Sequence, residues 1–498
     1  MAMTQSPGAS RLLLRGGMVI DGSGAPARAA DLLIEGDRIA AIVERHGGAD
    51  VLSHDIADRD IEVRDIAGLT VAPGFIDSHT HDDGYLLAHR DMTPKVSQGI
   101  TTVVTGNCGI SLAPSPSLDK LPQPLDLLGP RELFRFPRFA DWLAALRAQP
   151  AAVNVIPLVG HTTLRVAAMD DVSRPATPEE TARMQAMLAE AIEAGAFGMS
   201  TGTFYPPAAH ATTQEIIEVG EPLRKVSRAS SAIYATHLRD EADHIDAAIE
   251  EALDIGRALD TRVVFSHHKL AGERNHGRSA VTLARIGEAG RQQPVCLDCH
   301  PYPATSTMLR LDRVRLARRT MITWSEGYPE ASGRDFDDVQ RELGLDDDQM
   351  LARLSPAGAI YFLMSQEDVD RIVSDAQCMV GSDGLPFDKH PHPRQWGTFT
   401  RILADTVRER GLMPLETAIH KMTGLAARYY GLPDRGLLRP GMRADLVVFD
   451  PATVTDRATF DDPIQPSEGI AGVWVNGQRV WDGINATGAY PGEMLAPA

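Results

Sequence analysis

Eight apolar runs that end in polar residues constrain the fold of this chain more than any other feature of its sequence. They alternate with helical stretches and read VAPGFIDSHTH, ITTVVTGNCG, VNVIPLVGH, AFGMSTG, AIYATHL, RVVFSHHK, PVCLDCHPY and CMVGSDG. One helical stretch begins with a Thr-x-x-Glu capping box at Thr177 to Glu180. Eight parallel strands, each buried on both faces, are what a (β/α)8 barrel requires. The sequence therefore predicts an α/β fold with a TIM-type barrel at residues 73–430.

The two ends of the chain have a different pattern. Residues 1–72 and 431–498 contain short alternating runs separated by turn residues, and Asn476-Gly477 is a strong type I′ hairpin signal. We expect the two ends to pair into one small β domain beside the barrel.

Two connections are longer than a barrel needs. Residues 111–150, rich in proline and aromatic side chains, follow the second run, and residues 304–376 separate the seventh run from the eighth. Long insertions after barrel strands commonly form lids or specificity walls at an active site. We predict such a role for the 304–376 insertion.

Charge and cysteine content limit the class of function. The chain has 49 basic and 67 acidic residues, and its net charge of −18 argues against nucleic acid or an anionic membrane as the main partner. An anionic small-molecule substrate would need a local basic pocket. Four cysteines in 498 residues do not form a disulfide framework, and no stretch reaches ~18 uninterrupted apolar residues. We therefore expect a cytoplasmic protein with no export signal in MAMTQSPGASRLLLRGG and no membrane span.

The first run ends in a His-x-His motif, His79 and His81. With 16 histidines in the chain, roughly half an occurrence of this motif is expected by chance, so for the motif alone one packed and one solvated histidine is the favoured interpretation. Residues i and i+2 of a strand share a face, so both rings can also point into the barrel mouth. The ends of four other runs favour a metal site, because they hold Cys108, His237, His267 and Asp383.

Imidazole and thiolate ligands together favour zinc over magnesium or calcium. A catalytic zinc keeps one position open for water, lowers the pKa of that water and polarises a carbonyl group. Asp383 would then carry the proton from the water to the departing amine.

Several of these segments closely resemble the N-acyl-D-amino-acid deacylases, or D-aminoacylases, of the amidohydrolase superfamily. They are PGFIDSHTHDD, SQGITTVVTGNCGISLAP, TGTFYPPAAHATTQEIIEV, YATHLRDE, SHHK, GSDGLPFDKHPHPR and ADLVVFDPATV. The resemblance covers almost the whole chain, and the cysteine of GNCG is its most specific mark. It implies a tightly bound zinc held by Cys108, His237 and His267, and a second, weak or optional metal position at His79 and His81. It also implies that Asp383 is the catalytic base.

The same resemblance implies a substrate-binding pair. Lys269 and Arg394 match the family residues that hold the α-carboxylate of the substrate, and an ammonium and a guanidinium suit that anion. Taken alone, Arg394 could equally be a surface residue. His268 should point away from the site by strand alternation.

Two positions depart from the family pattern. His300 stands in LDCHPY where relatives have a tyrosine that contacts the substrate, while Tyr302 remains. Arg315 falls where relatives that act on apolar D-amino acids have an aliphatic residue, and a buried arginine there would need an anion such as a D-glutamate or D-aspartate side chain. An alternative is that Arg315 is solvated on a helix and Arg313 points inward.

The leading hypothesis is zinc-dependent hydrolysis of N-acyl-D-amino acids to a carboxylate and a free D-amino acid. A cyclic-amide or dipeptide hydrolase of the same superfamily is the second hypothesis, but those enzymes usually need a bridging carboxylate where this chain has Cys108. A catalytically silent barrel scaffold is the third, and it is disfavoured because no ligand position has been lost. The sequence predicts neither the acyl group nor the oligomeric state.

Overall fold

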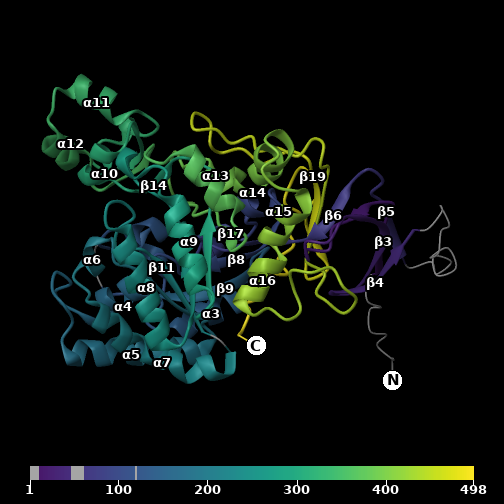
Figure 1. Ribbon diagram of the computed structural model, residues 1–498, viewed down its shortest axis with the longest axis horizontal. Helices are drawn as coiled ribbons and strands as arrows, with labels where there is room; N and C mark the ends of the chain where they lie inside the picture. The colour runs from purple at the N-terminus through teal and green to yellow at the C-terminus, as the bar shows by residue number, and fades with distance from the viewer. Residues whose placement is uncertain (1–10, 46–60, 118–120, 231, 498) are drawn as a thin grey trace.

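The structure is a computed structural model that describes residues 11–45, 61–117, 121–230 and 232–497 (Figure 1). The prediction of no export signal concerns residues 1–17, and the first ten of these lie outside the described ranges. No helix within them is long and apolar enough to cross a membrane.

Eight parallel strands follow one another around the barrel in chain order. They are β7 (Phe75–Asp77), β8 (Ile100–Thr105), β9 (Asn154–Gly160), β10 (Gly198–Gly202), β11 (Ile233–His237), β12 (Arg262–Phe265), β13 (Val295–Cys299) and β17 (Cys378–Val380). The ring closes where the Ser78 N–H donates to the Val380 carbonyl at 3.2 Å and the Asp383 N–H to the His79 carbonyl at 2.8 Å. Each strand coincides with one of the eight runs, so the predicted fold class is confirmed.

Both faces of the barrel strands are buried, which explains their continuous apolar character. Adjacent residues of one strand enter different cores. Ile76 packs with Val104 and Ile156 in the cluster that fills the barrel, whereas Phe75 packs between the strands and the surrounding helices.

Helices surround the barrel (Figure 1). The longer ones are α3 (Phe139–Ala148), α4 (His161–Ala168), α5 (Pro178–Ala194), α7 (Thr213–Ser230), α8 (Ile245–Leu259), α9 (Ser279–Ala289), α13 (Gln366–Ser374), α14 (Arg394–Arg401), the π-helix η5 (Ile402–Glu409), α15 (Leu415–Met422) and α16 (Gly424–Tyr430). The short ones are α1 (Tyr85–Ala88), α2 (Thr93–Val96), α6 (Pro206–Ala209), η1 (Leu125–Leu128), η2 (Arg131–Leu133) and η3 (Glu273–Asn275). The predicted capping box is present at α5, where Thr177 and Glu180 each accept a backbone N–H from the other.

Strands from both ends of the chain form one nine-stranded sheet, seen in Figure 1 as purple and yellow arrows side by side. The strands are β1 (Arg11–Arg15), β2 (Met18–Val19), β3 (Arg28–Glu35), β4 (Arg38–Glu44), β5 (Ile61–Asp65), β6 (Thr70–Pro73), β18 (Leu446–Phe449), β19 (Ile470–Val475) and β20 (Gln478–Trp481). β6 pairs antiparallel with β18 and so joins the two ends. β19 and β20 form the hairpin predicted at Asn476-Gly477.

The insertion between β13 and β17 has its own three-stranded sheet, β14 (Thr305–Met308), β16 (Ala357–Tyr361) and β15 (Thr320–Ser325). Its helices are α10 (Leu311–Leu316), η4 (Pro329–Ala331), α11 (Phe336–Leu343) and α12 (Asp347–Leu354). It extends from the barrel at the upper left of Figure 1. Because it leaves from the carboxyl end of β13, it lies at the barrel mouth where the polar strand ends meet.

Candidate metal centre and active site

Two groups of metal-ligating side chains meet at the barrel mouth and share Cys108. One contains Cys108, His237 and His267, and the other contains His79, His81, Cys108 and Asp383. Within each group the donor atoms lie within 4.8 Å of one another. All six residues are at least 95% buried. The structure thus brings together the five predicted metal ligands and the predicted catalytic base.

The loop after β8 presents Cys108 at the centre of this cluster. Gly106 and Gly109 flank it with φ angles of 75° and 76°, and a Cβ atom on Gly106 would lie 2.0 Å from the Leu158 carbonyl oxygen. Only glycine fits such positions. The buried Asp83 carboxylate accepts the N–H groups of Gly106 and Leu112, each at 3.2 Å, and so fixes both ends of the loop.

Three of the six site residues have a left-handed backbone. Cys108, His267 and Asp383 have φ angles of 52°, 37° and 50°. A non-glycine residue adopts this conformation at a cost of order 1–3 kcal/mol, and such strain concentrates at functional sites. The turn lets each side chain point into the cluster directly after its strand.

The first donor group is arranged around two imidazoles. The Cys108 Sγ lies 3.1 Å from the His267 Nε2. The His237 ring packs edge-on against the His267 ring, with centroids 4.5 Å apart, and stacks on Phe204 at 5.1 Å. Its two nitrogens have no hydrogen-bond partner within the described residues.

The second donor group adds a carboxylate. The Asp383 Oδ1 lies 3.5 Å from the His79 Nε2 and 3.2 Å from the His81 Nε2, and the His79 Nε2 lies 3.3 Å from the Cys108 Sγ. On its other side the His79 Nδ1 faces the Asp298 carboxylate at 3.3 Å. Burial lowers the pKa of His79 to about 3, so its ring is neutral and can ligate a cation.

The chemistry of the first group fits zinc. Burial lowers the pKa of His237 well below its usual range, which leaves a neutral imidazole with a free lone pair. Burial also raises the pKa of the Cys108 thiol, so a nearby cation is needed to stabilise the thiolate. One thiolate and two imidazoles would supply three protein ligands, the number typical of a catalytic zinc site.

Glu241 supports the first group and was not predicted from the sequence. Its carboxylate lies 3.2 Å from the His267 Nδ1 and 3.6 Å from the His237 Nε2, and it accepts a hydrogen bond from the Lys269 ammonium at 2.5 Å. A buried carboxylate that holds a ligand imidazole fixes its tautomer and orientation. The available signal was its position four residues after His237 in HLRDE.

Arg394 contacts the predicted base. Its guanidinium lies 2.9 Å from the Asp383 Oδ2 and donates to the His300 Nε2 at 3.2 Å. Burial alone would raise the pKa of the Asp383 carboxyl, but Arg394 and the neighbouring imidazoles outweigh it and hold that pKa well below its usual range. His300 therefore lies in the site, where the Arg394 guanidinium contacts both His300 and Asp383.

The structure corrects the expectation for Arg315. Its side chain is 63% exposed and pairs with Asp347 at 3.3 Å, so it does not line the site. Arg313, two residues earlier on α10, is the inward residue: its side chain is 7% exposed, lies 3.7 Å from the Glu241 carboxylate and stacks on Phe204 at 4.2 Å. Residues two apart on a helix point in nearly opposite directions, so only one can face the site.

Tyr302 and His268 lie away from the donor atoms. The Tyr302 ring packs against the Arg401 guanidinium at 4.9 Å, and its hydroxyl faces Gly397 of α14. The structure therefore does not bring this hydroxyl to the metal cluster. The His268 Nε2 lies 2.9 Å from the Thr282 hydroxyl, which agrees with the prediction that it points away.

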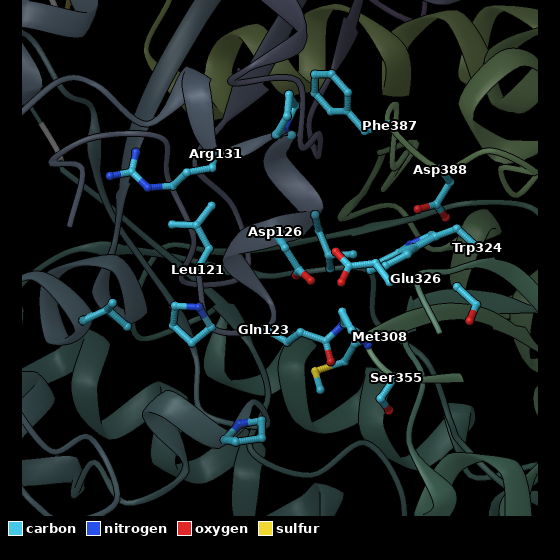
Figure 2. A pocket seen from close by; sticks show the side chains of 18 of the residues that line it. Leu121, Gln123, Asp126, Arg131, Met308, Trp324, Glu326, Ser355, Phe387 and Asp388 are labelled. Atoms are coloured by element: carbon cyan, nitrogen blue, oxygen red, sulfur yellow. The ribbon is translucent and has the colours of Figure 1, made fainter. Parts of the chain in front are cut away.

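A cavity of about 1340 Å³ lies outside the metal cluster, between the two long insertions (Figure 2). Leu121 to Arg131 line one side, and Trp324 to Glu326 and Ser355 line the other. Met308 separates the cavity from the site, because it lines the cavity and packs with Cys108 and Tyr205.

Comparison with known proteins identifies the family of this chain. The amidohydrolase family matches residues 62–223 and 221–481. An N-acyl-D-aspartate deacylase of Alcaligenes xylosoxydans xylosoxydans is 66% identical over 495 residues, which is 99% of this chain and 97% of that protein.

Two solved structures are similar over nearly the whole length. A D-aminoacylase studied for its binuclear metal centre, with one-metal activation and second-metal attenuation, has a TM-score of 0.93 at 54% identity and covers 98% of this chain and 100% of its own. An N-acyl-D-glutamate deacylase from Bordetella bronchiseptica, complexed with zinc and a phosphonate mimic of the tetrahedral intermediate, has a TM-score of 0.91 at 46% identity, with 98% and 99% covered. The chain therefore belongs to the amidohydrolase family and, within it, to the N-acyl-D-amino-acid deacylases.

Proposed function

We propose that this protein uses zinc to hydrolyse N-acyl-D-amino acids, with N-acyl-D-aspartates as its preferred substrates. The observation that carries the proposal is the buried Cys108, shared by two donor groups and faced by a carboxylate that is held ionised. The zinc bound by the solved N-acyl-D-glutamate deacylase supports the choice of metal.

Cys108, His237 and His267 hold the tight zinc. His79 and His81 form the second, weak or optional position, in which Asp383 takes part through its Oδ1. Glu241 supports the first group by orienting His267. Asp298 orients the His79 ring of the second group.

The reaction adds water to the acyl carbon and breaks the amide C–N bond. Zinc, when bound, supplies a Lewis acid that polarises the substrate carbonyl and acidifies water. Asp383 accepts the proton of the attacking water on its Oδ1 and returns a proton to the departing amine nitrogen. Arg394 keeps this carboxylate ionised and correctly turned through its contact with the Oδ2. The burial of the cluster excludes bulk water.

Three buried cations favour an acidic substrate. Lys269 and Arg394 are proposed to hold the α-carboxylate, and Arg313 the side-chain carboxylate of the D-residue. Among the described residues Arg313 pairs with one carboxylate, Glu241, at 3.7 Å, so it has donors available for a second anion. The likeness to an N-acyl-D-aspartate deacylase supports aspartate as that residue.

A paired substrate panel tests this function. Zinc-loaded protein should release amine from N-acetyl-D-aspartate faster than from the N-acetyl derivatives of D-glutamate, D-methionine, D-leucine and D-phenylalanine, and should not act on the L-forms. No amine release from any D-substrate would refute the deacylase function. Equal kcat/KM for D-aspartate and D-leucine derivatives would refute only the preference.

Two other functions make different predictions. A cyclic-amide or dipeptide hydrolase would bind two equally tight zinc ions per chain, which metal analysis would show. A silent scaffold would bind zinc without turnover. We also propose the reducing cytoplasm as the compartment, because the ligand Cys108 needs a free thiol.

A further inference from the structure

Four carboxylates line the cavity beyond Met308: Asp170, and a group of three in which Asp126 interacts electrostatically with Glu326 and with Asp388. Asp126, Glu326 and Asp388 all line it, and Figure 2 shows the Asp126 and Glu326 side chains directed toward the same space. Asp126 is half-buried, Glu326 is exposed and Asp388 is 92% buried. Mutual repulsion contributes to their electrostatics: after burial, Glu326 helps to raise the pKa of Asp126 to about 6, and Asp126 helps to raise the pKa of Asp388 to about 7.

Gln123 interacts with the Asp126 carboxylate, and Thr323 and Trp324 interact with that of Asp388, but one oxygen of each carboxylate stays unpaired among the described residues. The Asp126 Oδ1 and the Asp388 Oδ2 are buried atoms without a hydrogen-bond partner in the described part of the chain. Buried polar atoms are nearly always paired, so unpaired ones in a cavity wall are places where water or a polar group of a ligand can bind. Two cations also line the cavity, but Arg131 donates to the Phe134 carbonyl at 2.7 Å and Lys389 is exposed.

The ligand is not a small metal ion. Within the described chain, groups of three or more His, Cys, Asp or Glu donors within 4.8 Å of one another occur only at the barrel mouth. The remaining wall is largely apolar, with Leu121, Leu127, Met308, Trp324 and Phe387. Separated carboxylates, aromatic faces and an apolar channel suit an ammonium at the end of an alkyl chain.

The charges of the two compartments are opposite. Inside the barrel mouth Lys269, Arg313 and Arg394 favour the anionic D-residue, whereas acids outnumber bases among the charged residues that line the cavity. A D-aspartate side chain would be repelled by the cavity, so the part of the substrate that enters it is the acyl group. A volume of about 1340 Å³ is far larger than an acetyl group needs.

We propose that the preferred acyl group carries a terminal ammonium, so that the natural substrates are N-(ω-aminoacyl)-D-aspartates whose alkyl chain passes Met308 and whose ammonium lies in the negative field of Asp126, Glu326 and Asp388. This inference rests on the proposed deacylase function, because it names the acyl half of the same substrate. The reaction is unchanged: water adds to the acyl carbon, the amide bond breaks, and an ω-amino acid and D-aspartate leave.

Two matched substrate series test the proposal. One contains N-(ω-aminoacyl)-D-aspartates from 3-aminopropanoyl to 8-aminooctanoyl, and the other contains methyl-ended acyl groups of equal length. At the best length, the amine-ended substrate should have a kcat/KM about tenfold or more above its methyl-ended partner. Equal kcat/KM at every length would overturn the proposal.

Variants then assign the effect to the cavity. The triple variant Asp126→Asn, Glu326→Gln, Asp388→Asn should lose the advantage of the amine while its kcat/KM for N-acetyl-D-aspartate stays near wild type. The control Asp337→Asn, on exposed α11, should keep the advantage. If the triple variant is unstable, the exposed Glu326→Gln alone should reduce the advantage. An advantage that survives in both variants would refute the assignment.

A binding measurement separates this inference from the proposed function. Calorimetry should show that 6-acetamidohexylammonium binds wild-type protein more tightly than N-hexylacetamide does, and that Glu326→Gln reduces the difference. If N-acetyl-D-aspartate is not hydrolysed but this difference is found, the deacylase function fails and the ammonium site stands. If N-acetyl-D-aspartate is hydrolysed and the difference is absent, the ammonium site fails alone.

Discussion

The metal cluster and the outer cavity both gather charged side chains at the same mouth of the barrel, but they satisfy them differently. In the cluster two carboxylates face cations: Asp383 faces Arg394, and Glu241 faces Lys269. In the cavity Asp126 and Asp388 keep unpaired buried oxygens. Paired charges hold catalytic groups in fixed positions, whereas unpaired charges leave a place for a ligand. The comparison thus separates the part of the site that performs chemistry and holds the D-residue from the part proposed to select the acyl group.

The largest effect is expected for Cys108→Ala, because both donor groups lose their shared ligand. Tightly bound zinc should be lost, and activity should fall by more than the ~10²–10⁴-fold that proton transfer alone supplies. Metal analysis and turnover of N-acetyl-D-aspartate provide the measurement. Cys378→Ala, a buried cysteine of β17 outside the cluster, is the matched control and should keep its zinc. A full complement of tight zinc in Cys108→Ala would remove this residue from the ligand set.

Asp383→Asn should separate catalysis from metal binding. We expect kcat to fall about 10²–10⁴-fold while tight zinc is retained, because Cys108, His237 and His267 are unchanged. Asp388→Asn, five residues along the same loop, is the control and should leave turnover of N-acetyl-D-aspartate near wild type. Undiminished kcat in Asp383→Asn would rule out the proton-transfer role.

Glu241→Gln should weaken zinc binding about 10–100-fold, because the amide holds His267 less strongly than the carboxylate does. Competition with a chelator measures this affinity. Glu251→Gln removes a carboxylate of α8 that pairs with Arg239 and should not change it. Similar zinc affinity in both variants would show that Glu241 does not support the ligands.

Arg313→Met should raise KM for N-acetyl-D-aspartate about tenfold, with a smaller change for N-acetyl-D-leucine, because one charge-assisted contact with the acidic side chain is lost. Arg315→Met is the matched control, because the Arg315 side chain is exposed and pairs with Asp347 away from the site. A larger effect in Arg315→Met than in Arg313→Met would reverse the assignment of the inward arginine.

The smallest effect on activity, but a distinct effect on stability, is expected for Asp388→Asn. Burial raises the folded-state pKa of Asp388 from 3.8 to about 7, so folding favours the protonated acid. Its stabilising effect is complete below about pH 4 and is lost as the pH rises toward 7, at up to ~1.4 kcal/mol per unit. Urea unfolding from pH 4 to 8 should therefore show that the variant gains stability relative to wild type as the pH rises. A pH-independent difference would contradict the raised pKa.

The sequence predicts the barrel well because the information is local. Each strand combines a continuous apolar run with a polar end, and parallel strands bring those ends together whatever the loops do. The strand-end pattern alone therefore places six residues at one mouth of the barrel: His79, His81, Cys108, His237, His267 and Asp383.

The residues that the sequence did not place depend on non-local geometry. Glu241 reaches His267 only because β11 and β12 are neighbours, and Asp298 of β13 reaches His79 past the intervening strand β17. The choice between Arg313 and Arg315 depends on the rotation of α10, a short helix inside an insertion whose apolar pattern does not fix its orientation. Tyr302 lies beyond the end of β13, where strand alternation no longer determines its direction.

The left-handed backbone at Cys108, His267 and Asp383 has a consequence for the evolution of the chain. These residues follow their strands and give no side chain to the barrel core, which apolar residues such as Ile76 and Val104 form. Replacing one of them with glycine or asparagine removes strain and leaves the strand pairing intact. Loss of catalysis and loss of the fold are therefore separate events, and selection for activity alone keeps these three positions unchanged.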